Sequence, residues 1–419
     1  MRIALFSVFF LITIVSNAQT NTYLTDLAAL KSIVQKSASY KAQIKAYKQA
    51  NYNALYDRLS LDTIGSTNSY SYFYNLAQFL FPLRDNHLRF YQLPNYSNFK
   101  TKQTIDSFIK SDDFLDYPTC KINIDSLKIE LAKKPLDSIE GIYHYDKFYT
   151  VGLFQNENNE YIGVILDSHV SLWVKGQIAI HLYEFAPNLY KAIYGHPQFR
   201  NFILHPIEKY QNQSLVNSYF YGSYSESVYS KQLRQFDYVN LPKGTSKFSL
   251  RNINDDIQYL LIQSFQANKA TAKASQRFYD SIKSSLKASH LILDLRNNEG
   301  GAEKGMAKYF KLLKKYIKKG NLYVLLNNGT LSQAEIFALK LKQLKNVATI
   351  GQNTKGMLAY GSNYGKTERL PSGRFAIYPT DMNNGLKLLQ YEDYGIKPDI
   401  ILSDDEDWIQ KVIEIIRKK

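Results

Sequence analysis

Apolar and polar residues follow different periods in different parts of the chain. Apolar residues recur at helical spacing over 22–60, and a second helix is predicted over 70–83. Residues 137–185 instead alternate as strands do, around a polar turn at 156–159. This part predicts an inserted antiparallel β region that continues to about residue 243.

From residue 246 onward, strand patterns and helix patterns alternate. The predicted strands cover 256–265, 291–296, 321–326 and 346–351, and the predicted helices cover 275–288, 302–317 and 332–344. Such alternation is typical of an α/β layer on a largely parallel sheet. An amphipathic helix with an acidic start is predicted for the C-terminal residues, as the helix dipole favours.

The first residues have the pattern of a secretory signal. Arg2 is followed by a short apolar run, and Ser16-Asn17-Ala18 gives small residues at the two positions that a signal peptidase reads, so cleavage is expected before Gln19. We therefore expect an exported protein, periplasmic or extracellular, without stable membrane insertion. Four regions are predicted: a signal peptide at 1–18, an N-terminal helical region at 19–135, a β-rich insert at 136–245 and a catalytic α/β domain at 246–419.

Composition narrows the functional classes. The net charge is +15, but Lys and Arg are dispersed, clusters such as 311–319 resemble solvated helix faces, and no nucleic-acid recognition motif is present. Weak attraction to anionic surfaces or acidic substrates is compatible with this charge. The single cysteine, Cys120, cannot form an internal disulfide, and the seven histidines lack metal-ligand spacing. We expect no nucleic acid, no metal and no cofactor, and the sequence leaves the oligomeric state open.

Ser332 lies where a predicted strand passes into a predicted helix. A serine there is most often a helix cap, although Thr330 is also available for capping. A nucleophile at this place would gain from the positive end of the helix dipole. The main-chain N–H of Gln333 would then face a developing oxyanion. No GxSxG motif is present, which argues against the common α/β-hydrolase turn.

Two further segments carry candidate chemistry. DLRNNEGG, residues 294–301, ends a predicted strand in a Gly-Gly turn. Gly300 and Gly301 either serve the tight turn or let main-chain N–H groups approach a substrate carbonyl. His87, in LRDNHLRF, is either an ordinary histidine or the base that Ser332 needs.

Together these segments resemble the tail-specific (C-terminal processing) serine peptidases, family S41. The family's turn DLRxNxGG matches 294–301, and its nucleophile segment matches TLSQAEIFA, which implies Ser332 as the nucleophile. The family's T-x-G and G-x-P-D segments match VATIGQNTKG (347–356) and EDYGIKPDI (392–400). The resemblance covers about 25–95 and 246–405 and implies a crotonase-like (ClpP/crotonase) catalytic layer.

The family uses two kinds of base. The branch with a PDZ domain uses a lysine after the T-x-G glycine, where this chain has Met357, and Lys355 is the alternative base nearby. The tricorn-like branch uses a histidine near the N-terminus, with a serine before it, and a distant glutamate; His87 and Glu392 match the histidine and the glutamate, and no PDZ-like stretch is visible. Asn86 stands where that branch has serine and is a candidate relay.

The resemblance therefore implies an exported serine endopeptidase that acts on peptides or proteins. Ser332 would attack, His87 would act as base, Glu392 would orient His87, and Gln333 with Gly300 or Gly301 would form the oxyanion hole. Two alternatives remain, namely a catalytically inactive binding module on the same fold and a Ser/Lys variant that uses Lys355.

Overall fold

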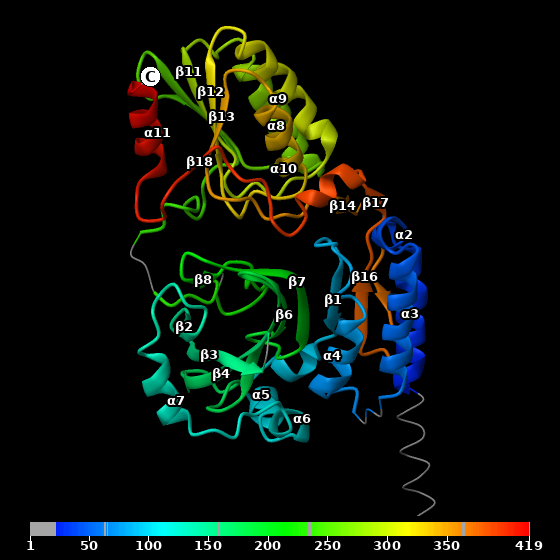
Figure 1. The fold of residues 1–419 in the computed structure, drawn as a ribbon. Coiled ribbons are helices and arrows are strands. Elements are labelled where there is room, and N and C mark those ends of the chain that lie inside the picture. The colour runs from blue at the N-terminus through cyan, green and yellow to red at the C-terminus, as the bar shows by residue number, and fades with distance from the viewer. Residues whose placement is uncertain are drawn as a thin grey trace, which may run out of the picture. The chain divides into compact units, whose positions relative to one another are not determined.

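The computed structural model describes residues 22–62, 64, 66–157, 159–225, 227–232, 236–362 and 365–418. The predicted signal peptide lies outside these residues and stays a prediction. The chain folds into two compact units, shown in Figure 1. Unit 1 comprises Met1–Leu233 and Ser362–Asn383, and unit 2 comprises Arg234–Gly361 and Asn384–Lys419. The predicted ranges 19–135 and 136–245 thus share one unit, which a later segment also joins.

Short helices precede and flank the sheet of unit 1. They are the helix over 22–36, α2 (Ala38–Gln43), α3 (Tyr47–Ser60), α4 (Tyr70–Gln78), η1 (Tyr96–Phe99), α5 (Lys102–Phe108), α6 (Asp112–Leu115) and α7 (Ile124–Leu131). Ser37 and Ser69 accept hydrogen bonds from the first turns of α2 and α4. The predicted helices are therefore present, and α4 ends four residues before Pro82.

Unit 1 contains one large antiparallel sheet, in the order β15-β16-β1-β7-β6-β5-β4-β3-β2 with β8 beside β7. The strands are β1 (Arg89–Gln92), β2 (Gly141–Tyr145), β3 (Tyr149–Glu157), β4 (Glu160–Ser168), β5 (Ile178–Ala186), β6 (Leu189–Gly195), β7 (Phe202–Gln211), β8 (Ser214–Leu215), β15 (Glu368–Arg369) and β16 (Phe375–Tyr378). β17 (Met382–Asn383) follows in the chain. The antiparallel insert is confirmed, and β1 joins it by pairing with both β7 and β16.

Tyrosines fill much of the unit 1 core, where 11 of the 34 tyrosines of the chain are buried. Several buried hydroxyls have partners: those of Tyr149 and Tyr229 are hydrogen-bonded at 2.7 Å, and that of Tyr52 donates to the Phe79 carbonyl. The guanidinium of Arg200 lies 4.0 Å from the ring centre of Tyr117 and 4.3 Å from that of Trp173. Rings with a polar end can thus fill this interior while several of their hydroxyls keep a hydrogen-bond partner, although the Tyr117 hydroxyl has none among the described residues.

Unit 2 is built on a six-stranded sheet in the order β18-β13-β12-β11-β10-β9. Its elements are β9 (Phe248–Asn252), β10 (Ile257–Ile262), α8 (Lys269–Ile282), β11 (His290–Asp294), α9 (Glu303–Tyr316), β12 (Asn321–Leu326), α10 (Gln333–Lys342), β13 (Val347–Gly351), β14 (Tyr360–Gly361), η2 (Leu386–Gln390), β18 (Ile400–Ile401) and α11 (Trp408–Arg417). All neighbours pair in parallel except β9 and β10. The predicted mixed α/β fold and largely parallel sheet are confirmed. The crotonase-like layer stays a prediction.

Helices cover both faces of this sheet (Figure 1). On one face, Met306 and Leu313 of α9 and Phe337 of α10 pack against apolar side chains of β10, β11 and β12. On the other face, Trp408 and Val412 of α11 pack over Tyr323 and neighbouring strand residues. Apolar residues therefore point to both sides of the parallel strands β10 to β13, which is why these strands read as largely apolar runs.

A buried ion pair anchors the end of β11. Asp294 accepts from Arg296 at 2.7 Å and from the Tyr259 hydroxyl at 2.8 Å. Arg296 also donates to the Tyr238 carbonyl and lies 5.6 Å from the ring centre of Trp408. Burial lowers the pKa of Arg296, but the Asp294 carboxylate outweighs this effect, so the pKa is raised overall. The Asp and Arg of DLRNNEGG thus have a structural role within unit 2.

This ion pair yields a stability prediction. Arg296→Met should lower the free energy of unfolding by about 3–5 kcal/mol, because the buried Asp294 carboxylate loses its charged partner. The double variant Asp294→Asn, Arg296→Met should recover a large part of that loss, since no unpaired charge remains. Denaturant unfolding measures both. A double variant that is no more stable than the single one would contradict this account.

Candidate active site

Ser332 occupies a strained turn between β12 and α10. It is the N-cap residue of α10, with φ 58° and ψ −124°, and its side chain is half-buried. A non-glycine residue in this conformation costs about 1–3 kcal/mol, and such strain collects at functional sites. The prediction of a serine between strand and helix is confirmed. The backbone is that of a sharp strand-to-helix turn, although the GxSxG motif is absent.

Because Gly300 has no side chain, its backbone can lie directly against the Ser332 turn. A side-chain carbon on Gly300 would lie 2.7 Å from the Gln333 nitrogen, 2.8 Å from the Leu331 carbonyl oxygen and 3.0 Å from Cβ of Ser332. The Leu331 N–H donates to the Asn298 carbonyl at 3.0 Å. The DLRNNEGG turn and the Ser332 turn are therefore direct neighbours, as expected for loops at the carboxyl ends of adjacent parallel strands.

The two glycines have different surroundings. The Gly300 N–H donates to Oδ1 of Asn298 at 2.9 Å. Gly301, at φ 134°, packs against the main chain of Phe265, where a side-chain carbon would approach to 2.3 Å. The Gly300 N–H is thus already used in a hydrogen bond within its own loop. Gly301 is therefore the better candidate for donating a hydrogen bond to an oxyanion.

A buried carboxylate, Glu335, ties the Ser332 turn to the next loop. Its Oε2 accepts the N–H groups of Ser332 at 3.0 Å and Met357 at 2.9 Å. Its Oε1 accepts the Thr354 hydroxyl at 2.6 Å and the Gly356 N–H at 2.8 Å. The side chain is fully buried. An acid at the third helical position usually caps only its own helix, whereas Glu335 also fixes residues 354–357 beside Ser332.

Residues 354–357 in turn interlock with the segment that carries Glu392. Thr354 accepts the Ile396 N–H at 2.7 Å, and the Asp393 N–H donates to the Gly356 carbonyl at 2.9 Å. Oε2 of the fully buried Glu392 accepts the N–H groups of Leu358 at 3.0 Å and Ala359 at 2.8 Å. Lys355 belongs to the same loop, and its N–H donates to the Thr330 carbonyl.

Asparagines hold the base of the site together. Asn327 donates from Nδ2 to the Val239 carbonyl at 3.0 Å, and its Oδ1 accepts the Asn297 N–H at 3.0 Å. Thr330 does not cap α10, which corrects the sequence interpretation. Its hydroxyl donates to the Leu295 carbonyl at 2.8 Å and accepts the Asn327 N–H at 3.2 Å. Ser332 itself takes the cap position.

His87 lies in unit 1, on a turn just before β1. The preceding Asn86 is buried, and His87 is half-buried. Oδ2 of the buried Asp85 carboxylate accepts the Thr380 hydroxyl, and the Leu88 N–H donates to the Asp85 main-chain carbonyl at 3.2 Å. Burial raises the pKa of Asp85, and hydrogen bonding around the carboxylate opposes the rise. Because β1 pairs with β16, a segment nearly 300 residues later in the chain helps to hold the His87 turn.

The predicted residues thus form two groups. Unit 2 brings together the elements that carry Ser332, Gln333, the two glycines, Lys355 and Glu392, and unit 1 holds Asn86 and His87 on one turn. Sequence reasoning missed Glu335, Thr354 and Asn298, although Glu335 stands three residues after Ser332, where a capping-box acid is expected. Two surface hollows in unit 1, lined by residues of α5 and by 166–175, contain none of the predicted site residues.

Among the described residues, no group of three or more His, Cys, Asp or Glu could hold a metal ion. Nor does any described helix have the length and apolar character to cross a bilayer.

Comparison with known proteins bears on the same segments. The model of peptidase family S41 matches residues 256–316 and 302–402, which include every loop described above in unit 2. Over these residues, the chain is similar to peptidase family S41. The family resemblance inferred from the motifs is thereby confirmed, and the S41 segment supplies Ser332, Glu335 and Glu392. No curated protein matches the chain.

Solved structures with similar chains include several proteases. The photosystem II D1 C-terminal processing protease has 15% identity and a TM-score of 0.38, over 94% of this chain and 97% of its own. Mature CPAF in complex with lactacystin has 11% identity and a TM-score of 0.42, over 96% and 98%. A lipoprotein from Streptococcus agalactiae has 22% identity and a TM-score of 0.30, over 42% and 70%. At these TM-scores, the similarity to S41 rests on the family model alone.

Gly300 allows a test of the S41 turn with a matched control. Gly300→Ala should slow labelling of the protein by a fluorophosphonate serine-hydrolase probe at least about 10-fold, because the new methyl group displaces the Gln333 nitrogen and Ser332. Gly244→Ala is the control, since Gly244 has a similar φ of 77° and no atom within 4 Å of the added carbon. Equal labelling of the two variants would show that Gly300 is needed only for its positive φ and not for the space that it leaves beside Ser332.

Glu335→Gln tests the carboxylate at the centre of the site. An amide offers one oxygen where two are needed, so two of the four donors lose their acceptor. We expect the free energy of unfolding to fall by about 2 kcal/mol or more and probe labelling to slow. The control is Glu303→Gln, at an exposed glutamate 3.4 Å from Lys340, which should change stability by less than about 0.5 kcal/mol. If Glu303→Gln lowered stability and labelling as much as Glu335→Gln does, the claim that Glu335 holds the site together would be contradicted.

Proposed function

We propose that this protein is an exported serine endopeptidase of the tail-specific type, with Ser332 as its nucleophile. The observation that carries the proposal is the strained Ser332 turn, which packs against Gly300 and is held by Glu335 within a segment that matches the model of a peptidase family. Peptide or protein substrates are proposed because peptidases of this family act on peptide bonds. Export rests on the N-terminal sequence pattern alone.

The proposed chemistry begins at Ser332. Its Oγ attacks the scissile carbonyl while the imidazole of His87 takes the hydroxyl proton. The N–H groups of Gln333 and Gly301 stabilise the oxyanion that forms, and one such donor is worth on the order of 10²-fold in turnover. His87 then returns the proton to the leaving amine, and water releases the acyl group by the reverse sequence of steps.

Glu392 is the proposed partner of the base. Two main-chain N–H groups donate to Oε2 of Glu392, which sets the orientation of the side chain. Neither of these two hydrogen bonds involves Oε1. Asn86 is the proposed relay between His87 and Glu392, because an amide side chain both donates and accepts. In unit 1, Asp85 supports this arrangement by fixing the turn rather than by touching the substrate.

A Ser/Lys mechanism is the second candidate. It is favoured by one observation, namely that Lys355 lies in the loop whose main chain bonds to Thr330, directly beside the Ser332 turn. Lysine bases of this kind occur in other serine hydrolases.

Probe labelling of single variants separates these functions. Ser332→Ala should abolish fluorophosphonate labelling, and His87→Ala should slow it by on the order of 10³-fold or more, because the serine loses its base. Lys355→Met should label at nearly the wild-type rate. Slow labelling of Lys355→Met together with normal labelling of His87→Ala would replace the histidine mechanism by the Ser/Lys mechanism. Complete inertness of the wild type toward the probe and toward peptide substrates would favour the binding module.

A further inference from the structure

Positive charge is concentrated on one side of unit 2. Residues 269–345 contain 16 of the 52 lysines and arginines of the chain but only five acids. Two of those five acids, Asp294 and Glu335, are fully buried. A stretch of less than a fifth of the chain therefore supplies most of the net charge of +15.

Four of the five lysines of α9 form a single stripe. Lys304, Lys308, Lys311 and Lys315 are spaced by four, three and four residues, which places them on one helical face. The opposite face of α9 is buried in the core. Lys304, Lys311 and Lys315 are exposed, and Lys308 is half-buried with its Nζ 3.1 Å from Oε1 of Gln276.

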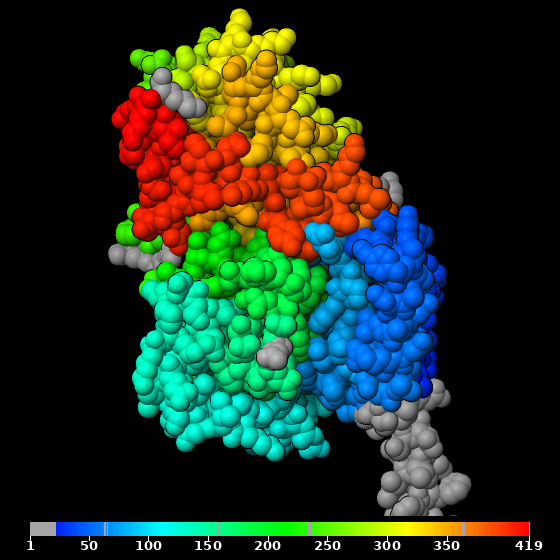
Figure 2. Space-filling view, in the orientation of Figure 1, coloured from blue at the N-terminus to red at the C-terminus, as the bar shows by residue number. Residues whose placement is uncertain are grey.

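The neighbouring helices extend this stripe into a surface. The Lys308 contact joins α9 to α8, on which Lys273 and Arg277 are exposed. On the exposed side of α8, α9 and α10, the acids are Asp280 and Glu303, which lie 3.1 Å from Lys283 and 3.4 Å from Lys340. We call the exposed basic residues of α8 and α9 the lysine face. Figure 2 shows the α8 and α9 part of unit 2, in yellow-green and yellow, at the molecular surface.

The charge is also one-sided within unit 2. On the other face of the sheet, α11 is preceded by the acidic run 404–407, and its Lys411 pairs with Glu406 at 2.9 Å. Unit 2 thus has a basic helical side and an acidic-to-neutral side. Such a charge distribution orients a molecule at a charged surface.

The chemistry of the lysine face identifies the kind of partner. The exposed cations are lysines with the exception of Arg277, so planar bidentate recognition by arginine contributes little. Among the described residues from 237 to 381, no large hydrophobic side chain is exposed. Stacking of nucleic-acid bases on aromatic side chains and insertion of apolar anchors into a bilayer are therefore both disfavoured there. What remains is diffuse attraction to a dense array of negative headgroups.

We propose that the lysine face of α8 and α9 docks the protein on the surface of an anionic lipid membrane. The attraction comes from the lysine ammonium groups and the lipid phosphates, and it falls off within a Debye length of about 8–10 Å at moderate salt. Association is peripheral and reversible by salt, because no apolar side chain enters the bilayer. Docking in this way would confine the peptidase to substrates at the membrane surface.

Vesicle sedimentation of the full chain tests the proposal. The wild type should sediment with vesicles that contain phosphatidylglycerol, stay in solution with pure phosphatidylcholine vesicles and dissociate in high salt. Lys304→Gln, Lys311→Gln and Lys315→Gln together should weaken binding on the order of 10²-fold, since each lysine near an anionic surface strengthens it several-fold.

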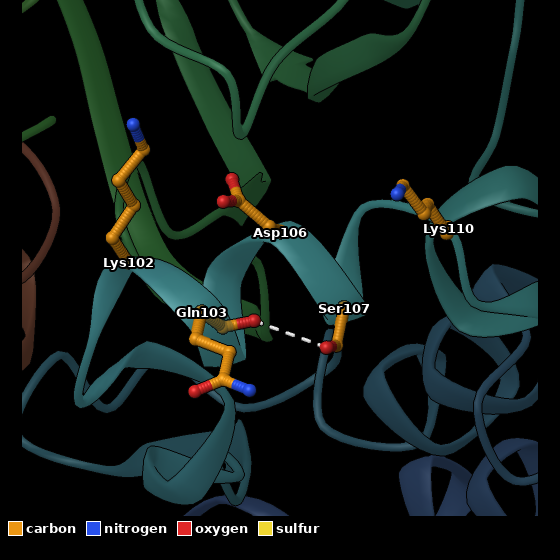
Figure 3. A pocket seen from close by; sticks show the side chains of 5 residues that line it. All are labelled: Lys102, Gln103, Asp106, Ser107 and Lys110. Carbon is orange, nitrogen blue, oxygen red and sulfur yellow. Dashed lines mark hydrogen bonds between the residues drawn. The ribbon is translucent and has the colours of Figure 1, made fainter.

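The matched control changes three lysines of unit 1 to glutamine, namely Lys100, Lys102 and Lys110, and so removes the same net charge. These lysines are exposed near α5, where Asp106 and other acids balance them, and Figure 3 shows Lys102 and Lys110 on either side of Asp106. We expect binding to fall less than about threefold.

Three outcomes would overturn the proposal. In the first, the control variant weakens binding as much as the α9 variant does, which would make total charge the cause. In the second, the wild type does not bind anionic vesicles. In the third, it binds heparin or DNA but not vesicles, which would identify a different polyanion. Thermal unfolding of both variants verifies that the fold is kept, and probe labelling reports the peptidase site independently.

Discussion

The site of unit 2 depends on one buried carboxylate. Glu335 accepts four hydrogen bonds, from the Ser332 turn on one side and from residues 354–357 on the other. A buried charge with so many donors is stabilising only as a complete set, because each missing partner leaves a desolvated group without compensation. The set therefore has a single good geometry, and that geometry positions the strained serine. Hydrogen bonds and packing outside the serine offset the free-energy cost of the strained Ser332 backbone.

Much of unit 2 could be predicted because its signals are local. β12 is a continuous apolar run, α10 follows with helical periodicity, and both were expected within two residues of their observed bounds. β9 was missed because it pairs antiparallel at the sheet edge and alternates only weakly, with all of its residues at least partly exposed. α8 begins six residues earlier than predicted, where Asn268 caps it and exposed polar residues hide the periodicity.

The contacts that make the site could not be predicted, because they join distant segments. The spacing S-x-x-E suggested a helix cap, but nothing in the sequence shows that Glu335 also binds the N–H groups of Gly356 and Met357. Likewise, the motif RDNH identified His87, yet its turn depends on Thr380 and on the pairing of β1 with β16. Gly300 read equally well as a turn glycine, and only its 2.7 Å approach to Gln333 shows what a side chain there would disrupt.

The central claim, that Ser332 is an activated nucleophile, is tested most directly by locating the covalent adduct. The purified protein would be treated with a fluorophosphonate probe, digested and sequenced by mass spectrometry. The account predicts one adduct, on Oγ of Ser332 in the peptide that contains TLSQAEIFA, and none after heat denaturation. An adduct on another serine of the folded protein, with Ser332 unmodified, would contradict it.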